Sequence, residues 1–542
     1  MPSSSPTGQQ FTRAAGVVVP LFALRGPHDV GTGDMLDLLP FIDWLADANQ
    51  RVVQLLPINE TAPGDTSPYN ALSAFAIDPT YVSVRHVPEV AQSAAAQRWL
   101  RRHDTQEELR RLGAAAHREH HTAWRTKLQL LEWGFEAFEA EPASTRREAF
   151  TRFCNRNVWW LDDYTLYRAL REQHGWAGWE AWPARLRRRE SPAVARAAAT
   201  LAGRRRFLAY VQWVAAEQWA EVRRHAQYRG VLLKGDLPFV CARDSADVWT
   251  HRDLFDLSSS VGTPPDAFSA TGQAWGLPLY DWAAMQRSDF RWWRQRARHA
   301  RELYDLFRVD HVVGLYRTYA IPVRPGGTVG FTPHDETAQL SQGTHLLRAL
   351  LEEAGAAVGV IAEDLGTVPT WVRQSLTDLR IPGYQVFRWE WHAGAFVDPR
   401  TYPALSVATS GTHDTDTLAD WWPSLGPDDR AAVYRGIGLE VAPHANPHAV
   451  WPEVHRALLE RLYDAASVLT ILPIQDLFGW PERINTPATI SETNWTYRLP
   501  ATAEGLSRDP DIAARMREIR AWTERAGRAT APPRTDPHPV RA

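Results

Sequence analysis

The chain has 542 residues, more than one compact core usually holds, so we expect either two domains or one large barrel with insertions. Its 60 basic and 63 acidic residues give a net charge of −3, which argues against the strongly basic face of a nucleic-acid-binding protein. The hydrophobic content of 44% predicts a folded core, and tryptophan (25) outnumbers phenylalanine (18) and tyrosine (15), a surplus of flat rings that suits sugar faces.

Cysteine usage and the N-terminus indicate the compartment. Only Cys154 and Cys241 are present, which excludes a disulfide framework and a cysteine-based zinc cluster and fits a reducing environment. Residues 1–10 lack the charged and apolar regions of a signal peptide, and no run reaches the ~18 apolar residues of a membrane span. We therefore expect a cytoplasmic protein that does not enter a membrane.

Short apolar runs that end in polar or turn residues recur along the chain and have the length of buried parallel strands. Helical stretches such as 36–48 and 343–354 lie between several of them, so strand and helix alternate. This order predicts a (β/α)8 TIM barrel. The eight predicted strands are residues 17–24, 52–57, 231–235, 306–309, 358–362, 384–387, 405–409 and 468–473.

The second and third runs are too far apart for a βα loop of ~2–6 residues, so residues 60–230 are predicted to form a mostly helical insertion subdomain. Its arginine clusters at 187–189 and 204–206 alternate with Leu and Ala and lie near Glu, which favours a solvated helix face. Long loops are expected at 240–282 and 315–335. The predicted division is a disordered tail (1–15), the barrel (16–59 and 231–502), the insertion (60–230), and a C-terminal helix with a loose tail (503–542).

Acidic residues follow four of the predicted strands: Asp236 the third, Asp310 the fourth, Glu363 the fifth and Asp414 the seventh. In a barrel these ends meet at one mouth, where active sites lie. Converging carboxylates repel each other, so their presence indicates either metal binding or glycoside transfer. The tryptophan surplus favours sugar chemistry.

Arg308 precedes Asp310 by two residues, so on a regular strand both side chains point to the same side. A guanidinium there would keep Asp310 ionised, as a nucleophile requires. A purely structural ion pair at a strand end would show the same spacing.

Several motifs in this order make the chain resemble the amylomaltase, or disproportionating-enzyme, family. The resemblance runs from about residue 31 to 499 and rests on the joint order of the motifs, since each alone is weak. They are SPYNALSAFA (67–76), GDLP (235–238), DSADVW (244–249), PPD (264–266), TGQAWG (271–276), RVDH (308–311), AEDLG (362–366), THDTDT (412–417), NTP (485–487) and NW (494–495).

The resemblance implies a 4-α-glucanotransferase that moves maltooligosaccharyl segments between α-1,4-glucans without an organic cofactor. The sequence has no separate oxygen-rich loop with calcium-type spacing, so no metal is expected. By position, Asp310 matches the nucleophile, Glu363 the general acid/base and Asp414 the transition-state stabiliser. The expected partners are maltooligosaccharides and other α-1,4-glucans, and the expected state is a monomer or weak homodimer. The positions that match sugar contacts are Tyr69, Asp236, Gln273, Trp275, Arg308, His413 and Asn485.

Some of these residues have structural interpretations as well. Tyr69 and Trp275 would pass for core or loop-anchoring aromatics without their motifs. His413 alone would pass for a structural histidine, and Asp414 beside it reaches the same site only if the strand ends in a turn. The histidine-rich segment 117–121 lacks the His-Glu-x-x-His spacing of a zinc site and is predicted to be a solvated helix.

The chain also departs from the common family pattern. Where many members carry Tyr, Glu, Arg and Asn, it has Ala267, Ala270, Ala274 and Leu277, and Val-Val-Gly at 312–314 replaces the frequent Phe-Arg-Gly. These changes leave the glucan length preference open. A retaining α-glucan hydrolase shares the same acids and is the alternative function, whereas the joint presence of the three acids argues against a non-catalytic glucan-binding protein.

Overall fold

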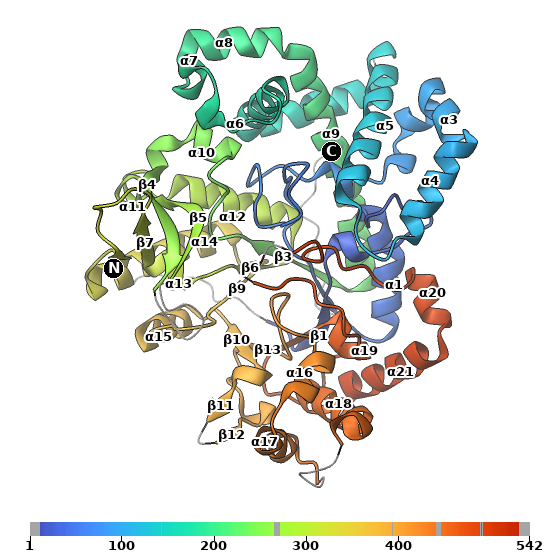
Figure 1. The fold of residues 1–542 in the computed structure, drawn as a ribbon, viewed down its shortest axis with the longest axis vertical. Coiled ribbons are helices and arrows are strands. Elements are labelled where there is room, and N and C mark those ends of the chain that lie inside the picture. Colours follow the sequence, from blue (N-terminus) through green and yellow to red (C-terminus); the bar gives the residue numbers. More distant parts are fainter. Residues whose placement is uncertain are drawn as a thin grey trace.

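Eight parallel strands form a barrel at the centre of the computed structural model, which describes residues 11–141, 144–264, 272–392, 394–440, 446–487, 489 and 491–529 (Figure 1). Neighbouring strands follow the order β10-β13-β14-β1-β2-β3-β6-β9. Across the seam between β9 and β10, the Ala362 N–H donates to the Pro382 carbonyl at 2.9 Å. The predicted TIM barrel is therefore confirmed. The strands are β1 (Ala14–Val18), β2 (Val52–Gln54), β3 (Leu232–Leu237), β6 (Leu306–Val309), β9 (Gly359–Ala362), β10 (Gly383–Val386), β13 (Ser406–Thr409) and β14 (Leu469–Pro473).

The first strand begins earlier than its apolar run predicted. β1 starts at Ala14, so the expected disordered tail over residues 1–15 is wrong at its end; residues 1–10 lie outside the described ranges. The predicted strand 17–24 is cut short because Pro20 has no N–H for a sheet bond, and a 3-10 turn follows at Leu21–Ala23. Gly16 allows β1 to approach β2, since a Cβ there would lie 2.2 Å from the Val52 carbonyl oxygen.

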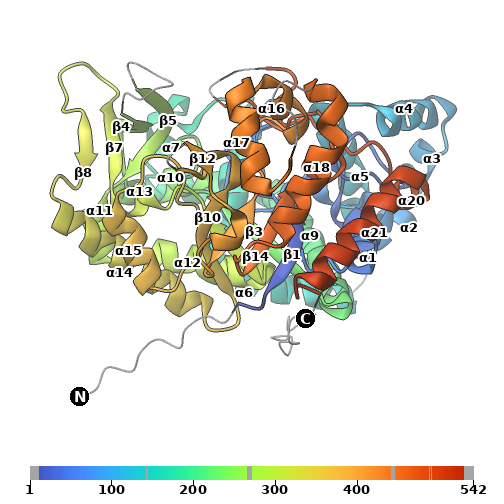
Figure 2. The same cartoon turned by 90° about the horizontal axis from the view of Figure 1, so that it is seen from below.

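Helices surround the barrel and cover its apolar outer face, as the alternating pattern predicted (Figures 1 and 2). Their buried faces carry the residues spaced at helical intervals, such as Leu346, Leu347 and Leu350. No helix in the described ranges has both the length and the apolar character needed to cross a bilayer. The outer helices are α1 (Leu38–Asp47), α12 (Arg291–Leu303), α14 (Glu336–Ala354), α15 (Thr370–Asp378), α16 (Leu418–Ser424), α17 (Pro427–Ile437), α18 (Pro447–Tyr463), α19 (Ile474–Phe478), α20 (Ala503–Arg508) and α21 (Pro510–Arg525).

A helical insertion lies between β2 and β3, as predicted. Its last helix also belongs to the barrel wall, because Trp219 Nε1 donates to the Leu303 carbonyl at 2.9 Å and His225 contacts Asp43 of α1 at 2.9 Å. The division of the chain at residues 60 and 230 stays a prediction. The insertion contains α2 (Pro88–Gln92), α3 (Ala94–Leu100), α4 (His103–Ala114), α5 (His120–Ala140), α6 (Thr145–Gln173), α7 (Ala184–Arg187), α8 (Ser191–Thr200) and α9 (Ala202–Arg229).

Many tryptophans serve the core rather than a sugar surface. Five are among the largest fully buried side chains, namely Trp219, Trp249, Trp292, Trp293 and Trp422. Other tryptophans pack against arginine side chains of the insertion. For example, the Arg168 guanidinium lies 4.2 Å from the centre of the Trp176 ring and pairs with Glu60 at 2.8 Å. The arginine clusters do pair with nearby acids, as in Arg188 with Glu190 and Arg204 with Glu172.

The two long loops predicted after the third and fourth strands pair with each other. They form an antiparallel sheet in the order β5-β4-β7-β8, joined where Ser260 faces Ile321 (Figure 2). The sequence prediction missed this sheet because its middle pair joins segments far apart in the chain. The strands are β4 (Phe255–Thr263), β5 (Gln273–Tyr280), β7 (Thr318–Pro322) and β8 (Gly330–Thr332).

One C-terminal helix with a loose tail was predicted, and the structure has two helices there, α20 and α21. Arg528 is fully buried, and its guanidinium donates to the carbonyls of Ala465 at 2.6 Å and Ser467 at 2.9 Å. These bonds fasten the chain to the loop before β14, so Arg528 does not belong to the loose tail expected at the C-terminal end. Residues 530–542 lie outside the described ranges.

Candidate active site

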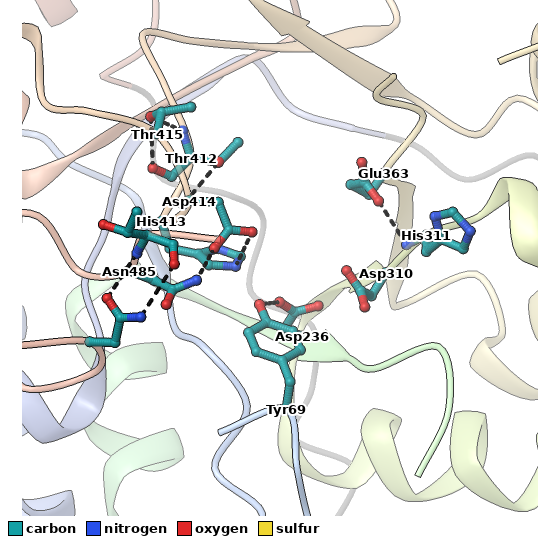
Figure 3. Close-up of polar contacts among 12 residues, drawn as sticks. Tyr69, Asp236, Asp310, His311, Glu363, Thr412, His413, Asp414, Thr415 and Asn485 are labelled. Atoms are coloured by element: carbon teal, nitrogen blue, oxygen red, sulfur yellow. Dashed lines mark hydrogen bonds and ion pairs between the residues drawn. The ribbon is translucent and has the colours of Figure 1, made fainter. Parts of the chain in front are cut away.

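Four acids from four strands meet at the carboxyl-terminal edge of the barrel sheet (Figure 3). Asp236 lies near the end of β3, Asp310 directly follows β6, Glu363 directly follows β9, and Asp414 lies in the turn after β13. Parallel strands deliver their ends to one mouth, which is where barrel enzymes hold their reacting groups. The structure therefore brings together the acids that the strand ends predicted.

Arg308 links three of the acids. Its Nη1 lies 2.7 Å from Asp236, and its Nη2 lies 2.8 Å from Asp310 and 3.8 Å from Glu363. Burial on β6 opposes its charge, but Asp236 and the other carboxylates outweigh this and raise the pKa of Arg308 well above its usual range. A permanent cation therefore offsets the repulsion between the acids.

Glu363 is mostly buried, with 13% of its side chain exposed. Burial raises its pKa to about 7; Arg308 opposes this rise and Asp310 adds to it. Its Oε2 accepts the backbone N–H of His311 at 2.7 Å, and its Oε1 accepts that of Leu365 at 3.2 Å. Near neutral pH this carboxyl group exists in both protonation states, the property of a group that gives and takes a proton.

His311 takes an unusual backbone conformation to make that bond. Its φ is +46°, in the left-handed region that non-glycine residues seldom adopt. Its ring packs edge-on against Trp275, with centroids 5.0 Å apart, and against Phe239 at 5.4 Å. Sequence reasoning missed this role, because neither the sign of φ nor a backbone bond to Glu363 can be read from a histidine.

Asp310 is oriented by donors on two sides. Arg308 holds its Oδ1, and the Phe239 N–H donates to its Oδ2 at 3.4 Å. The predicted contact between Arg308 and Asp310 therefore exists, although Arg308 divides its guanidinium among three carboxylates rather than serving Asp310 alone.

The strand before His413 and Asp414 ends in a turn, which brings both side chains to the same site. The sequence predicts their joint presence only with such a turn. The Thr415 N–H donates to the Thr412 carbonyl at 3.3 Å, and His413 Nε2 lies 3.3 Å from Asp414 Oδ2. Asn485 Nδ2 donates to Asp414 Oδ1 at 2.6 Å.

The surroundings of Asp414 favour its ionised form. Burial alone would raise the pKa of Asp414, but His413 and the bond from Asn485 outweigh it and lower the pKa to about 2. Burial likewise disfavours the His413 cation, yet Asp414 more than compensates and raises the pKa of His413. Asp414 is therefore ionised at neutral pH, in contrast to Glu363.

Tyr69 lies between Asp236, which pairs with Arg308, and the His413–Asp414 pair. Its hydroxyl donates to Asp236 Oδ2 at 2.6 Å, and its ring stacks on that of His413 with centroids 5.1 Å apart. Trp495 packs against both rings at 5.7 Å. Tyr69 is thus a wall of the site, and Trp495 is a further wall residue that the site prediction did not include.

The remaining predicted residues are placed less centrally. Trp275 is 37% exposed and borders the site through His311. Gln273 begins β5, where its backbone pairs with Thr263, and within the described part of the chain its side chain makes no hydrogen bond with the acids. Ala267 and Ala270, with the rest of 265–271, lie outside the described ranges.

The segment 117–121 is not the solvated helix that was predicted. Helix α5 starts only at His120, and Arg118 and His120 are buried, with 7% and 4% of their surfaces exposed. Arg118 packs its guanidinium 4.7 Å from the Phe22 ring, which explains its burial. Among the residues that the structure describes, no three His, Cys, Asp or Glu side chains form a cluster suited to a metal ion.

Two further basic residues lie close to the acids of this site, and sequence reasoning singled out neither. Arg483 Nη2 donates to the Asp414 carbonyl at 2.9 Å, while its Nη1 pairs with Asp416. Lys234 lies fully buried on β3, where it donates to Gln54 at 2.7 Å and to the Tyr384 hydroxyl at 2.5 Å. Its place two residues before Asp236 was the only signal available for Lys234.

Comparison with known proteins agrees with this arrangement. The sequence profile of the 4-alpha-glucanotransferase family, glycoside hydrolase family 77, matches residues 19–503. The 4-alpha-glucanotransferase of Chlamydia muridarum is 32% identical over 505 residues, covering 91% of this chain and 92% of that protein. That of Thermus thermophilus is 32% identical over 530 residues, covering 95% and 100%.

Solved structures agree on the fold. The amylomaltase from Streptococcus agalactiae, solved in complex with acarbose, superposes with a TM-score of 0.80 at 24% identity and covers 96% of this chain and all of that one. The profile match and the coverage of relatives above 30% identity decide the assignment: this chain belongs to the 4-alpha-glucanotransferase family.

Proposed function

We propose that this 4-alpha-glucanotransferase uses a retaining double displacement in which Asp310 is the nucleophile, Glu363 the general acid/base and Asp414 the stabiliser of the transition state. The substrates are maltooligosaccharides and other α-1,4-glucans. A retaining mechanism needs one ionised carboxylate as the nucleophile and one protonated carboxyl group as the acid. The acids of this site lie in different environments that suit these two roles.

In the first step, Asp310 attacks C1 of the sugar whose bond is to be broken. The bond from C1 to the leaving 4-oxygen breaks as the bond to Asp310 forms, and Glu363 gives its proton to that oxygen. The pKa of Glu363, raised to about 7 by burial, keeps enough of the protonated form for this step near neutral pH.

In the second step, the 4-hydroxyl of an acceptor glucan attacks C1 of the glycosyl-enzyme. Glu363, now ionised, takes the acceptor's proton, and Asp310 leaves as a carboxylate. Two inversions at C1 retain the α configuration. The backbone N–H of His311, bonded to Glu363 Oε2, steadies the ionised form during this half of the cycle.

Asp414 acts on the hydroxyls next to C1. These become better hydrogen-bond donors as positive charge builds on the ring, so an ionised acceptor binds the transition state more strongly than the ground state. Burial works against ionisation of Asp414, but His413 and Asn485 outweigh it and hold its pKa at about 2, which keeps it in the acceptor form.

The observation that carries this proposal is the shared contact of Asp310 and Glu363 with Arg308 Nη2. At 2.8 Å and 3.8 Å from one nitrogen, the two carboxylate oxygens are separated by at most about 6.6 Å, compatible with the ~5–5.5 Å of retaining enzymes. The same nitrogen pairs closely with the acid that must be ionised and loosely with the one that must carry a proton.

The sugar contacts are proposed for the residues that line the mouth. Tyr69 and Trp275 offer ring faces for stacking, and Asp236, Arg308, His413, Asn485 and Gln273 offer hydrogen-bond partners for hydroxyls. Asp236 and Arg308 reach the sugar while paired with each other, so removal of either would disturb both binding and the charge balance of the acids.

The product pattern from maltotriose tests the proposal. Transfer conserves the number of glycosidic bonds, so we expect glucose plus a ladder of longer maltooligosaccharides, with almost no gain in reducing ends. An acceptor can compete with water at ~55 M because effective molarities in oriented sites reach ~10⁵ M or more. A rise in reducing ends that matches glucose release, with no product longer than the donor, would instead establish the hydrolase alternative.

A further inference from the structure

A hollow lies on the outer wall of the barrel, and none of the four acids of the candidate active site lines it. Its volume is about 530 Å³, within the range of ligand-binding sites. It is bounded by the end of α19 and by α20 and α21. Helix α20 packs on α1, and α21 packs on α20 (Figures 1 and 2). We call it the α19–α21 groove and define it by Phe478, Trp480, Pro500, Asp509, Asp511 and Arg515.

Aromatic rings make one side of the groove. Trp480 stacks on Phe478, with centroids 4.8 Å apart and planes at 25°, and Phe478 stacks on Trp44 of α1 at 5.9 Å and 22°. Trp44, Phe478 and Trp480 therefore form a stack of three rings, with Trp480 at the end away from α1. Such a ring presents a rigid flat apolar face at little conformational cost.

The backbone fixes the orientation of Trp480. Gly479 ends α19 in the left-handed conformation, with φ +70°, and the Trp480 N–H donates to the Gln475 carbonyl at 2.9 Å. The indole is therefore set by a helix cap rather than by a free loop, so little order has to be gained when a ligand binds.

Polar groups line the opposite side and limit the kind of ligand. Asp509 caps the N-terminus of α21, where its exposed carboxylate accepts the backbone N–H groups of Asp511 and Ile512. Asp511 is exposed in the first turn, and Arg515 pairs with Glu518 at 3.0 Å. Two carboxylates beside a guanidinium that already has a partner disfavour phosphates and other anions. Carboxylates next to a flat apolar face instead match a neutral ligand rich in hydroxyls.

Two chain segments run from the groove to the catalytic mouth. Phe478 and Trp480 line the groove, and a few positions later Arg483 and Asn485 donate hydrogen bonds to Asp414. Likewise, Trp495 packs on Tyr69 and His413, and Pro500 lines the groove. The groove and the Asp414 side of the mouth are therefore built on the same two chain segments.

We infer that the α19–α21 groove is a non-catalytic binding site for α-1,4-glucan chains, with Trp480 as its stacking platform. This rests on the proposed function only for the identity of the polymer. The site holds a long chain while its end enters the mouth, so it acts on polymeric substrates and leaves short ones unaffected. Neither Trp480 nor its neighbours in the groove touch the reacting atoms.

The test is native electrophoresis through gels containing amylose, combined with maltotriose conversion by the same preparations. Trp480→Ala should weaken retention by amylose about tenfold, a loss of about 1.4 kcal/mol of binding. Trp480→Leu keeps apolar bulk against Phe478 but removes the flat face, and it should weaken retention as much. Tyr228→Ala removes a 76% exposed aromatic on α9, outside the groove, and should leave retention unchanged.

The outcomes separate the groove from the catalytic site. Weakened retention and a raised KM for amylose, with maltotriose conversion within about twofold of wild type, support the inference. If Trp480→Ala lowers the melting temperature, Trp480→Leu decides. Unchanged retention in Trp480→Leu overturns the inference whatever the maltotriose result, and a mass of two chains in light scattering would then assign the groove to a second copy.

Discussion

Arg308 opposes the rise that burial causes in the pKa of Glu363, and this opposition can be tested by removing the charge of Arg308. Arg308→Met takes away the cation 3.8 Å from Glu363 and leaves Asp310 nearby without its partner. The ionised form of Glu363 then loses an attraction and meets a stronger repulsion, so both changes raise its pKa. In the proposed mechanism the rate depends on protonated Glu363 in the first step, and we therefore expect the basic limb of the pH profile to move to higher pH.

The magnitude follows from the contact distance. Two unit charges 4 Å apart interact by about 4 kcal/mol at an effective dielectric constant near 20, and one pKa unit corresponds to about 1.36 kcal/mol. The 3.8 Å contact thus sets an upper limit of about 3 units, which relaxation and entering water reduce to about 1–2 units. Starting from about 7, the basic limb should move to between about 8 and 9.

The assay is kcat/KM for maltotriose, measured from glucose release across pH 5 to 10, since this parameter reports the ionisation of the free enzyme. The rate itself should fall by about 10² or more, because a charge that supports the transition state is lost. Arg223→Met is the matched control. Arg223 also pairs with an acid, Asp305 at 3.0 Å, but Asp305 precedes β6 and lies at the opposite end of the barrel.

The shift of the limb separates an electrostatic role from a structural one. If Arg308 only held the fold together, its loss would lower the rate and the melting temperature and leave the limb near pH 7. A limb that stays there, or that moves to lower pH, would refute the reasoning. Arg308→Lys keeps a cation and should show a smaller shift than Arg308→Met.

Three further predictions address single features of the site. Asp310→Asn should abolish transfer and leave the fold and glucan binding largely intact, and activity within a few-fold of wild type would contradict its assignment. His311→Asn should keep the pH profile, because asparagine tolerates the left-handed φ of +46°. His311→Val should disturb the bond from the backbone N–H of residue 311 to Glu363, raise the pKa of Glu363 and move the basic limb to higher pH. Equal pH profiles for the two variants would rule out a role for this backbone bond. Treatment with EDTA should leave activity unchanged, because the acids at the mouth already bond to protein donors such as Arg308 and Asn485; loss of activity that a divalent ion restores would show otherwise.

The sequence alone determined the barrel and the position of its acids. Buried parallel strands need nearly continuous apolar runs, and a run ends where its chain meets water, so Asp310 and Glu363 could be placed at strand ends before any contact was known. The same local reasoning located the helical insertion, because no βα loop is that long. Roles for individual residues came from the resemblance of the motifs to a family.

The tertiary structure decided what depends on contacts between distant segments. The sheet of β4, β5, β7 and β8 arises from two separate loops, whose pairing leaves no local pattern. The burial of Arg118 under the Phe22 ring is equally long-range, and a histidine-rich segment with charged neighbours was therefore mistaken for a solvated helix.

The electrostatics of the site also required the assembled barrel. A pKa depends on burial and on charges within a few ångströms, and strands far apart in sequence supply both. The sequence predicted that Arg308 serves Asp310, whereas the fold shows it shared with Asp236 and Glu363. Spacing along one strand indicates which side chains face the same way, and only the packing of neighbouring strands decides which of them meet.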